Sequence, residues 1–239
     1  MLRAALATIA VAALVAGCGS KSKPQSIQPP IKTAPKGPDP GKQVIDAFVA
    51  AAGRGDAKAL WALLSAPTQA RLGPLSHFRS ATAVALAESV GSFARSTYNE
   101  IVSERVTDRF GVVAIAGFRP AEGTREYAAY GTALRLEEGS WRVELGGPIE
   151  IKVLGPGPGP AEQPVVQVGA EIHARGGGLA TAVGWLDGAT VPSQLRGTTK
   201  AATFFANLAS PVARGRHTAV VFAGGAKDAS ATAWTFSVR

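Results

Sequence analysis

Residues 134–145, which read LRLEEGSWRVEL, decide the fold of the first half of the chain. Leu134 and Leu136 precede the turn EEGS, and Trp141 and Val143 follow it. Apolar and polar side chains alternate on both sides of the turn, so the apolar ones share one face of a hairpin and can meet across it. The pattern predicts that this segment closes an antiparallel sheet.

Strands and helices are expected upstream of this hairpin. Apolar residues recur at helical spacing after residue 43, and Gly53-Arg54-Gly55 is expected to end the first helix. Asp56 is expected to cap a second helix that stops near Pro67. A third helix is expected over Ala81–Phe93. Strands are then expected near residues 98–107, 112–118, 125–136 and 141–145. Helices followed by strands indicate an α+β domain over residues 43–150.

The order of these elements resembles the NTF2-like superfamily of small cone-shaped α+β domains. The resemblance is carried by VIDAF at 44–48, which leads to GDA at 55–57, and by GSWRVEL at 139–145. It implies a conical pocket between helices and sheet, which some relatives use for isomerase or dehydratase chemistry. The aromatic residues that could line this pocket are Trp61, Phe93, Tyr98, Tyr127, Tyr130 and Trp141. Tyr127 and Tyr130 are three residues apart and therefore point to opposite faces of a regular strand.

Residues 164–239 show short apolar segments separated by Gly, Pro and Asp-Gly turns, which is typical of an all-β domain. Strands are expected at 165–174, 181–186, 203–208, 217–223 and 231–238. The segments WLDG at 185–188, GRHTAV at 215–220 and WTFSV at 234–238 resemble a bacterial immunoglobulin-like domain. The resemblance implies a β-sandwich and leaves its function open.

Two further segments read as connectors. Residues 151–163 contain GPGPGP at 155–160, which indicates a linker between the two domains. Residues 18–42 contain six prolines and five lysines, which favour an extended spacer.

The only cysteine of the 239 residues, Cys18, follows a signal-like segment. Arg3 precedes an apolar run, Leu6–Val15, that is too short to span a bilayer. The segment VAGC at 15–18 resembles a bacterial lipobox, which implies cleavage between Gly17 and Cys18 and acylation of the cysteine. The alternative is a stray cysteine beside an ordinary cleavage site. The resemblance places the mature protein on the extracytoplasmic face of the membrane.

The formal net charge of +8 is concentrated in the spacer, because residues 43–150 hold nearly equal numbers of acidic and basic residues. The spacer lysines either contact an anionic membrane or wall polymer or merely keep the segment solvated. No stretch of the sequence combines basic residues with interleaved aromatics, so nucleic acid is not an expected partner.

Sequence motifs that would indicate catalysis or metal binding are weak. His77, His173 and His217 are far apart and have no cysteine partner, so we expect no metal site and no cofactor. No Gly-x-Ser-x-Gly segment occurs. We therefore expect a noncatalytic, lipid-anchored envelope protein that binds a wall polymer, a partner protein or an apolar ligand. The alternative is a small-molecule enzyme or carrier that uses the conical pocket.

Overall fold

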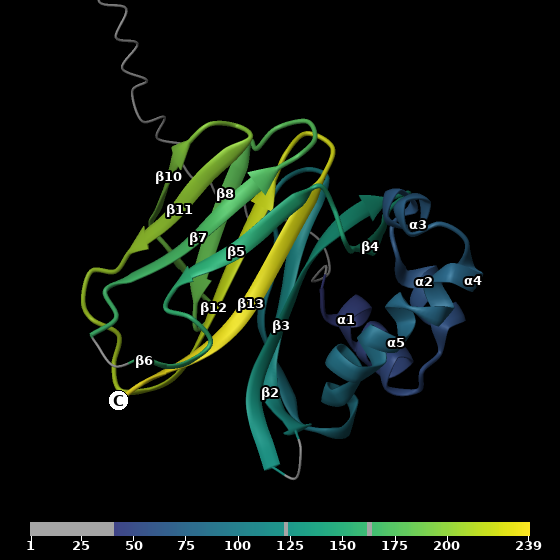
Figure 1. Cartoon of the computed structure of the whole chain (residues 1–239), viewed down its shortest axis with the longest axis horizontal. Helices are drawn as coiled ribbons and strands as arrows, with labels where there is room; N and C mark the ends of the chain where they lie inside the picture. Colours follow the sequence, from purple (N-terminus) through teal and green to yellow (C-terminus); the bar gives the residue numbers. More distant parts are fainter. Residues whose placement is uncertain (1–40, 122–123, 162–163) are drawn as a thin grey trace, which may run out of the picture.

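The computed structural model describes residues 41–121, 124–161 and 164–239 (Figure 1). Gly17 and Cys18, and with them the predicted signal and most of the spacer, lie outside these residues. Within the described residues, the model contains no helix with the length and apolar character needed to cross a bilayer.

Short helices form the first layer, largely where the sequence indicates them. Asp56 caps the second helix by accepting a hydrogen bond from the Ala59 N–H at 3.0 Å, as predicted. This helix ends at Leu63, close to the predicted stop near Pro67. Pro67 itself lies in the first turn of a further helix, where its missing N–H costs no helical hydrogen bond. The elements are α1 (Lys42–Gly53), α2 (Ala57–Leu63), α3 (Ala66–Leu72), α4 (Leu75–Ser80), α5 (Thr82–Ser89) and the 3₁₀ helix η1 (Val90–Arg95).

Four antiparallel strands follow as sheet A, in sequence order, and all four agree with the predicted strands. They are β1 (Tyr98–Arg105), β2 (Phe110–Ala121), β3 (Thr124–Glu137) and β4 (Ser140–Glu144). The predicted hairpin is confirmed, because Leu134 lies opposite Val143 and Leu136 opposite Trp141. Its turn uses two left-handed residues, Glu138 at φ 48° and Gly139 at φ 79°.

The helices cover one face of sheet A and bury a continuous apolar core against it. Phe48, Leu60, Phe78 and Phe93 are each at most 1% exposed in this core. Since helices pack on one face of an antiparallel sheet, the first half of the chain is an α+β structure, as its sequence indicates.

The second half forms two further sheets, which pack face to face around a second core that includes Ile172, Phe204, Val221 and Trp234. Sheet B has the order β10-β11-β7-β5 and sheet C the order β6-β13-β12-β8-β9. The strands are β5 (Ile149–Gly155), β6 (Gly159–Ala161), β7 (Gln167–Ala174), β8 (Thr181–Leu186), β9 (Ala189–Val191), β10 (Ser193–Gly197), β11 (Ala201–Asn207), β12 (Gly215–Gly224) and β13 (Ala229–Val238).

The structure corrects the prediction of a linker over residues 151–163. Most of its described residues belong to sheets, because β5 pairs with β7 and β6 pairs with β13. The physical reason is the alternation in β5, where Ile149, Ile151 and Val153 occupy every second position. The proline-glycine run therefore begins at the end of an edge strand and does not separate two bodies.

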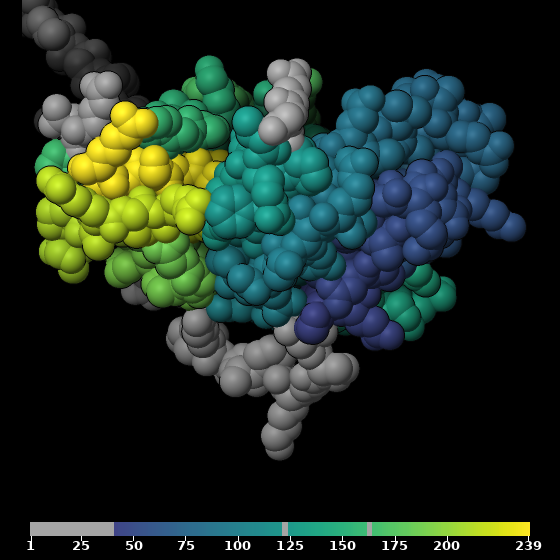
Figure 2. Space-filling model, turned by 90° about the horizontal axis from the view of Figure 1, so that it is seen from below, coloured from purple at the N-terminus to yellow at the C-terminus, as the bar shows by residue number. Residues whose placement is uncertain are grey.

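Sheets A and C also pack against each other, so the chain forms four layers: helices, sheet A, sheet C and sheet B (Figures 1 and 2). Val112 and Ala114 of β2 meet Trp185 and Val220 of sheet C in a third buried cluster. The sheets approach closely at Gly131, where an added Cβ would lie 2.9 Å from the Cβ of Ala233. The two halves of the chain thus share a core.

Candidate functional site

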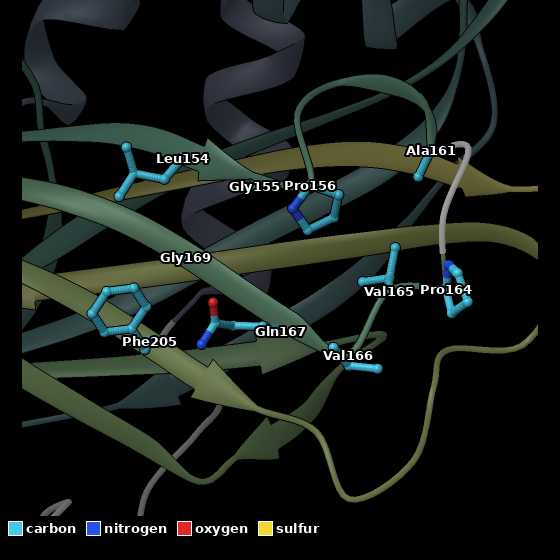
Figure 3. A pocket seen from close by; sticks show the side chains of 10 residues that line it. All are labelled: Leu154, Gly155, Pro156, Ala161, Pro164, Val165, Val166, Gln167, Gly169 and Phe205. Atoms are coloured by element: carbon cyan, nitrogen blue, oxygen red, sulfur yellow. The ribbon is translucent and has the colours of Figure 1, made fainter.

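An open groove of about 380 Å³ lies on sheet B, where β5 ends and β7 begins (Figure 3). Leu154 comes from β5, Gly169 from β7 and Phe205 from β11. In the strand register, Gly169 lies opposite both Gly155 and Phe205. The groove is therefore built across three neighbouring strands.

Gly169 forms the floor of the groove, and its lack of a side chain leaves the space open. A Cβ at this position would lie 3.7 Å from Leu154 Cβ and 3.8 Å from Phe205 Cδ1, which are ordinary contact distances. A larger residue at 169 would thus extend from the sheet between Leu154 and Phe205. The floor is open because of one missing side chain and not because of a gap in the backbone.

Pro156, Ala161 and residues 164–166, which belong to the segment between β5 and β7, form the opposite wall. The Trp234 indole donates a hydrogen bond to the Pro156 carbonyl at 2.7 Å and fixes the beginning of this segment. Its end is fixed to the chain after β11, because Leu208 donates to Val166 O at 2.9 Å and Val212 donates to Val165 O at 2.8 Å. The wall therefore has a backbone hydrogen-bonded at both ends.

The lining is apolar and partly unprotected from water. Leu154 and Val166 are each 52% exposed, and they are two of the three large apolar residues that the structure leaves exposed in the described residues. Gln167 is the only lining residue with a polar side chain, and its amide donates to Asn207 Oδ1 at 2.8 Å. The lining offers neither an acid, a base nor a nucleophile, so its chemistry is that of apolar binding.

The sequence did not predict this groove. Residues 154–163 fall within the predicted linker, and four strands separate them in the sequence from Phe205 on β11. One signal was available in the segment PVVQV at 164–168, which is apolar at adjacent positions and therefore places apolar side chains on both faces of a strand.

The residues named for the conical pocket mostly lie in the core between the helices and sheet A. These are Trp61, Phe93, Tyr98, Tyr130 and Trp141. Trp61 packs on Phe78 with ring centroids 5.2 Å apart, and the Tyr130 ring stacks on Phe48 at 6.4 Å. Tyr127 lies on the opposite face of β3, where it contacts Phe118. Five of the six predicted residues therefore lie in the same region, where they pack in or against the core between the helices and sheet A.

The two core tyrosines have different polar environments. Tyr98 donates a hydrogen bond to Asp46 Oδ1 at 2.9 Å, and burial together with this carboxylate raises its pKa to about 12. Burial raises the pKa of Tyr130 to about 12 against a smaller, opposite effect of the Thr132 side chain, and the Tyr130 hydroxyl has no hydrogen bond that meets geometric criteria within the described part of the chain. Both phenols stay protonated well above neutral pH, which makes neither of them a ready base.

The histidines do not assemble into a metal site. In the ranges 41–121, 124–161 and 164–239, no group of three or more His, Cys, Asp or Glu side chains is arranged to hold an ion. His217 instead connects two turns, with Nδ1 at 2.7 Å from Asp187 Oδ2 and Nε2 at 2.8 Å from the Ala213 carbonyl. Asp187 also accepts the Thr218 N–H at 2.8 Å, so this pair is a structural clamp.

A comparison with models of known protein families finds no match for this chain. A comparison with curated proteins also finds no match. We therefore infer the function from the geometry of the groove and from the sequence.

Proposed function

We propose that this protein is a noncatalytic, lipid-anchored binding protein of the cell envelope. Cys18 is the acylated residue, and the body formed by residues 41–239 presents the groove of sheet B on the extracytoplasmic side. In this proposal the first half of the body is an NTF2-like α+β unit and the second an immunoglobulin-like sandwich. The mixed α+β arrangement with antiparallel sheets is compatible with both assignments.

The composition of the groove carries the binding function. Two half-exposed apolar side chains, Leu154 and Val166, lie beside an aromatic ring in a space of about 380 Å³. A volume of this order suits a small ligand or one segment of a long one. Since no charged side chain lines the space, the ligand that it favours is an apolar chain, such as the hydrocarbon of a lipid.

Filling the groove tests the binding function. In Gly169→Val, the added side chain occupies the floor without backbone strain, because its Cβ meets only ordinary contacts. We expect the dissociation constant of cis-parinaric acid, a fluorescent fatty acid, to rise about tenfold, which corresponds to about 1.4 kcal/mol. Gly177→Val is the matched control, because nothing lies within 4 Å of a Cβ at that exposed position. Equal affinity in both variants would contradict the assignment.

Removing the thiol tests the anchor. In Cys18→Ala, no sulfur remains to accept a lipid, so we expect the protein to leave the membrane fraction or to accumulate with its signal segment uncleaved. Ser20→Ala, two residues away, keeps the thiol and is expected to fractionate like the unaltered chain. Fractionation followed by mass spectrometry measures both outcomes. A Cys18→Ala chain that stays with the membrane and still carries lipid would rule out the anchor.

A further inference from the structure

Four residues from three strands form a cluster at one end of the interface between sheets A and C. Phe118 on β2 and Tyr127 on β3 lie opposite each other, with ring centroids 5.3 Å apart. The Arg216 guanidinium, from β12, lies 4.7 Å from the Phe118 centroid and 5.2 Å from that of Tyr127. Arg125 approaches Phe118 at 5.7 Å. We call these four residues the arginine–aromatic rim.

The rim lies at the end of the molecule toward which the β2–β3 hairpin extends (Figure 1). Figure 2, viewed from this side, shows the teal atoms of sheet A directly against the yellow-green atoms of β12. Two more arginines belong to this end, because Arg214 and Arg239 flank the paired residues Gly215 and Val238. The described part of the β2–β3 hairpin projects from the molecule at this end (Figure 1).

Within the described residues, the charges of the two rim arginines and of the neighbouring Arg214 are not balanced by ion pairs. Arg125, Arg214 and Arg216 are all exposed, and among the described residues none of them forms an ion pair with a carboxylate. Two acidic residues of the described part of the chain have other partners, since Glu126 pairs with Arg119 at 3.0 Å and Asp187 with His217 at 2.7 Å. The half-buried rings of Phe118 and Tyr127 lie directly beneath this charge.

We propose that the arginine–aromatic rim binds an anionic phospholipid surface. Arginine attracts lipid phosphates, and aromatic rings at the same level favour the boundary between headgroups and acyl chains. A projecting end suits a flat membrane, whereas a thread-like polyanion is better held in a groove. The contact does not require acylated Cys18. In the anchored protein this contact orients the folded body, because the end that carries the rim faces the bilayer.

The test uses the full chain with Cys18→Ala, so that one new cysteine can carry an environment-sensitive NBD dye. The dye is attached at Pro120→Cys, an exposed position paired with Arg125, or at Ser76→Cys on α4 as the reference position. Vesicles contain phosphatidylcholine with or without phosphatidylglycerol. We expect a blue shift at position 120, and none at position 76, only when phosphatidylglycerol is present. Added salt should reverse the shift.

Paired substitutions assign the effect to the rim. Arg125→Ala with Arg216→Ala should remove the shift and lower partitioning onto the anionic vesicles roughly twenty-five-fold, at about fivefold for each arginine. Lys58→Ala with Arg79→Ala removes the same charge from exposed positions on α2 and α4 and should leave the shift unchanged. Arg125→Lys with Arg216→Lys keeps the charge and should retain most of the binding.

Three results would overturn the proposal. The first is an unchanged shift in the double alanine variant, and the second is an equal loss in the Lys58/Arg79 control. The third is binding of soluble polyphosphate without any shift on vesicles, which would assign the rim to a polymer. Equal thermal midpoints of the variants establish that each one is folded. Because every chain in this test lacks Cys18, the outcome is independent of both tests of the proposed function.

Discussion

The hydroxyl of Tyr130 lies in the core between the helices and sheet A without a hydrogen-bond partner in the described residues. A buried polar group without a partner costs free energy, so its removal should help the fold. We predict that Tyr130→Phe raises the free energy of unfolding by about 1 kcal/mol. Urea denaturation followed by tryptophan fluorescence measures this change. Tyr98→Phe is the comparison with the opposite sign, because it removes the bond to Asp46. Destabilisation of both variants would contradict this account.

Tyr130 also makes the free energy of unfolding depend on pH in the alkaline range. The pKa of Tyr130 is raised from 10.0 to about 12 in the folded protein, so the folded chain holds its proton where the unfolded chain has lost it. The folded state therefore keeps its full stability below pH 10 and loses stability as the pH rises from 10 toward 12, because burial opposes ionisation of this phenol. We predict a shallower loss of stability over this range in Tyr130→Phe, measured by urea denaturation at successive pH values. Parallel curves for the two proteins would exclude this role.

At the scale of the element, the turn of the β3–β4 hairpin depends on two left-handed residues. Gly139 has φ 79°, a conformation that residues with a Cβ adopt only at a cost. We predict that Gly139→Ala lowers the free energy of unfolding by about 1 kcal/mol, measured by urea denaturation. Gly177→Ala is the control, because that glycine is exposed and its φ does not lie in the left-handed region. An equal loss in the two variants would show that the turn conformation is not responsible.

Local patterns explain which elements could be predicted. The first helix and the hairpin at 134–145 have periodicity, caps or turn residues within a few positions of each other. The short elements α3, β9 and β10, of seven, three and five residues, were not predicted because none of them shows a clear period. The groove was not predictable, because Leu154, Gly169 and Phe205 meet only through the order of strands in sheet B. The rim has the same origin, since Arg216 comes from a distant strand.

At the scale of the whole molecule, the sequence of β2 indicates burial on both faces, and one of these faces belongs to the core shared by sheets A and C. Residues 112–116 read VVAIA and are all fully buried, so this strand is covered on both faces. Such a continuous apolar run indicates two-sided burial, whereas alternation indicates one solvated face. The sequence indicates that the second face of β2 is buried, but it does not indicate that sheet C packs against this face.

The tight contact at Gly131 tests whether the layers unfold together. In Gly131→Val, the new Cβ would lie 2.9 Å from Ala233 Cβ and 3.0 Å from the Ala233 backbone nitrogen, so the sheets must separate. We predict a loss of about 2 kcal/mol in the free energy of unfolding. Hydrogen exchange should accelerate in sheet A and in sheet C to a similar extent. Faster exchange confined to one sheet would mean that the two halves unfold independently.

The third core, between sheets A and C, also limits how the chain can be divided for study. A fragment that ends at residue 150 would keep Val112, Ala114 and Ala133 but lose the Trp185 and Phe222 side chains that cover them. It would carry an uncovered apolar face, and such faces drive aggregation. Insolubility of this fragment would then reflect the absence of sheet C and would not show that the first half is unable to fold. For this protein the smallest soluble unit is expected to run from the first helix to the last strand.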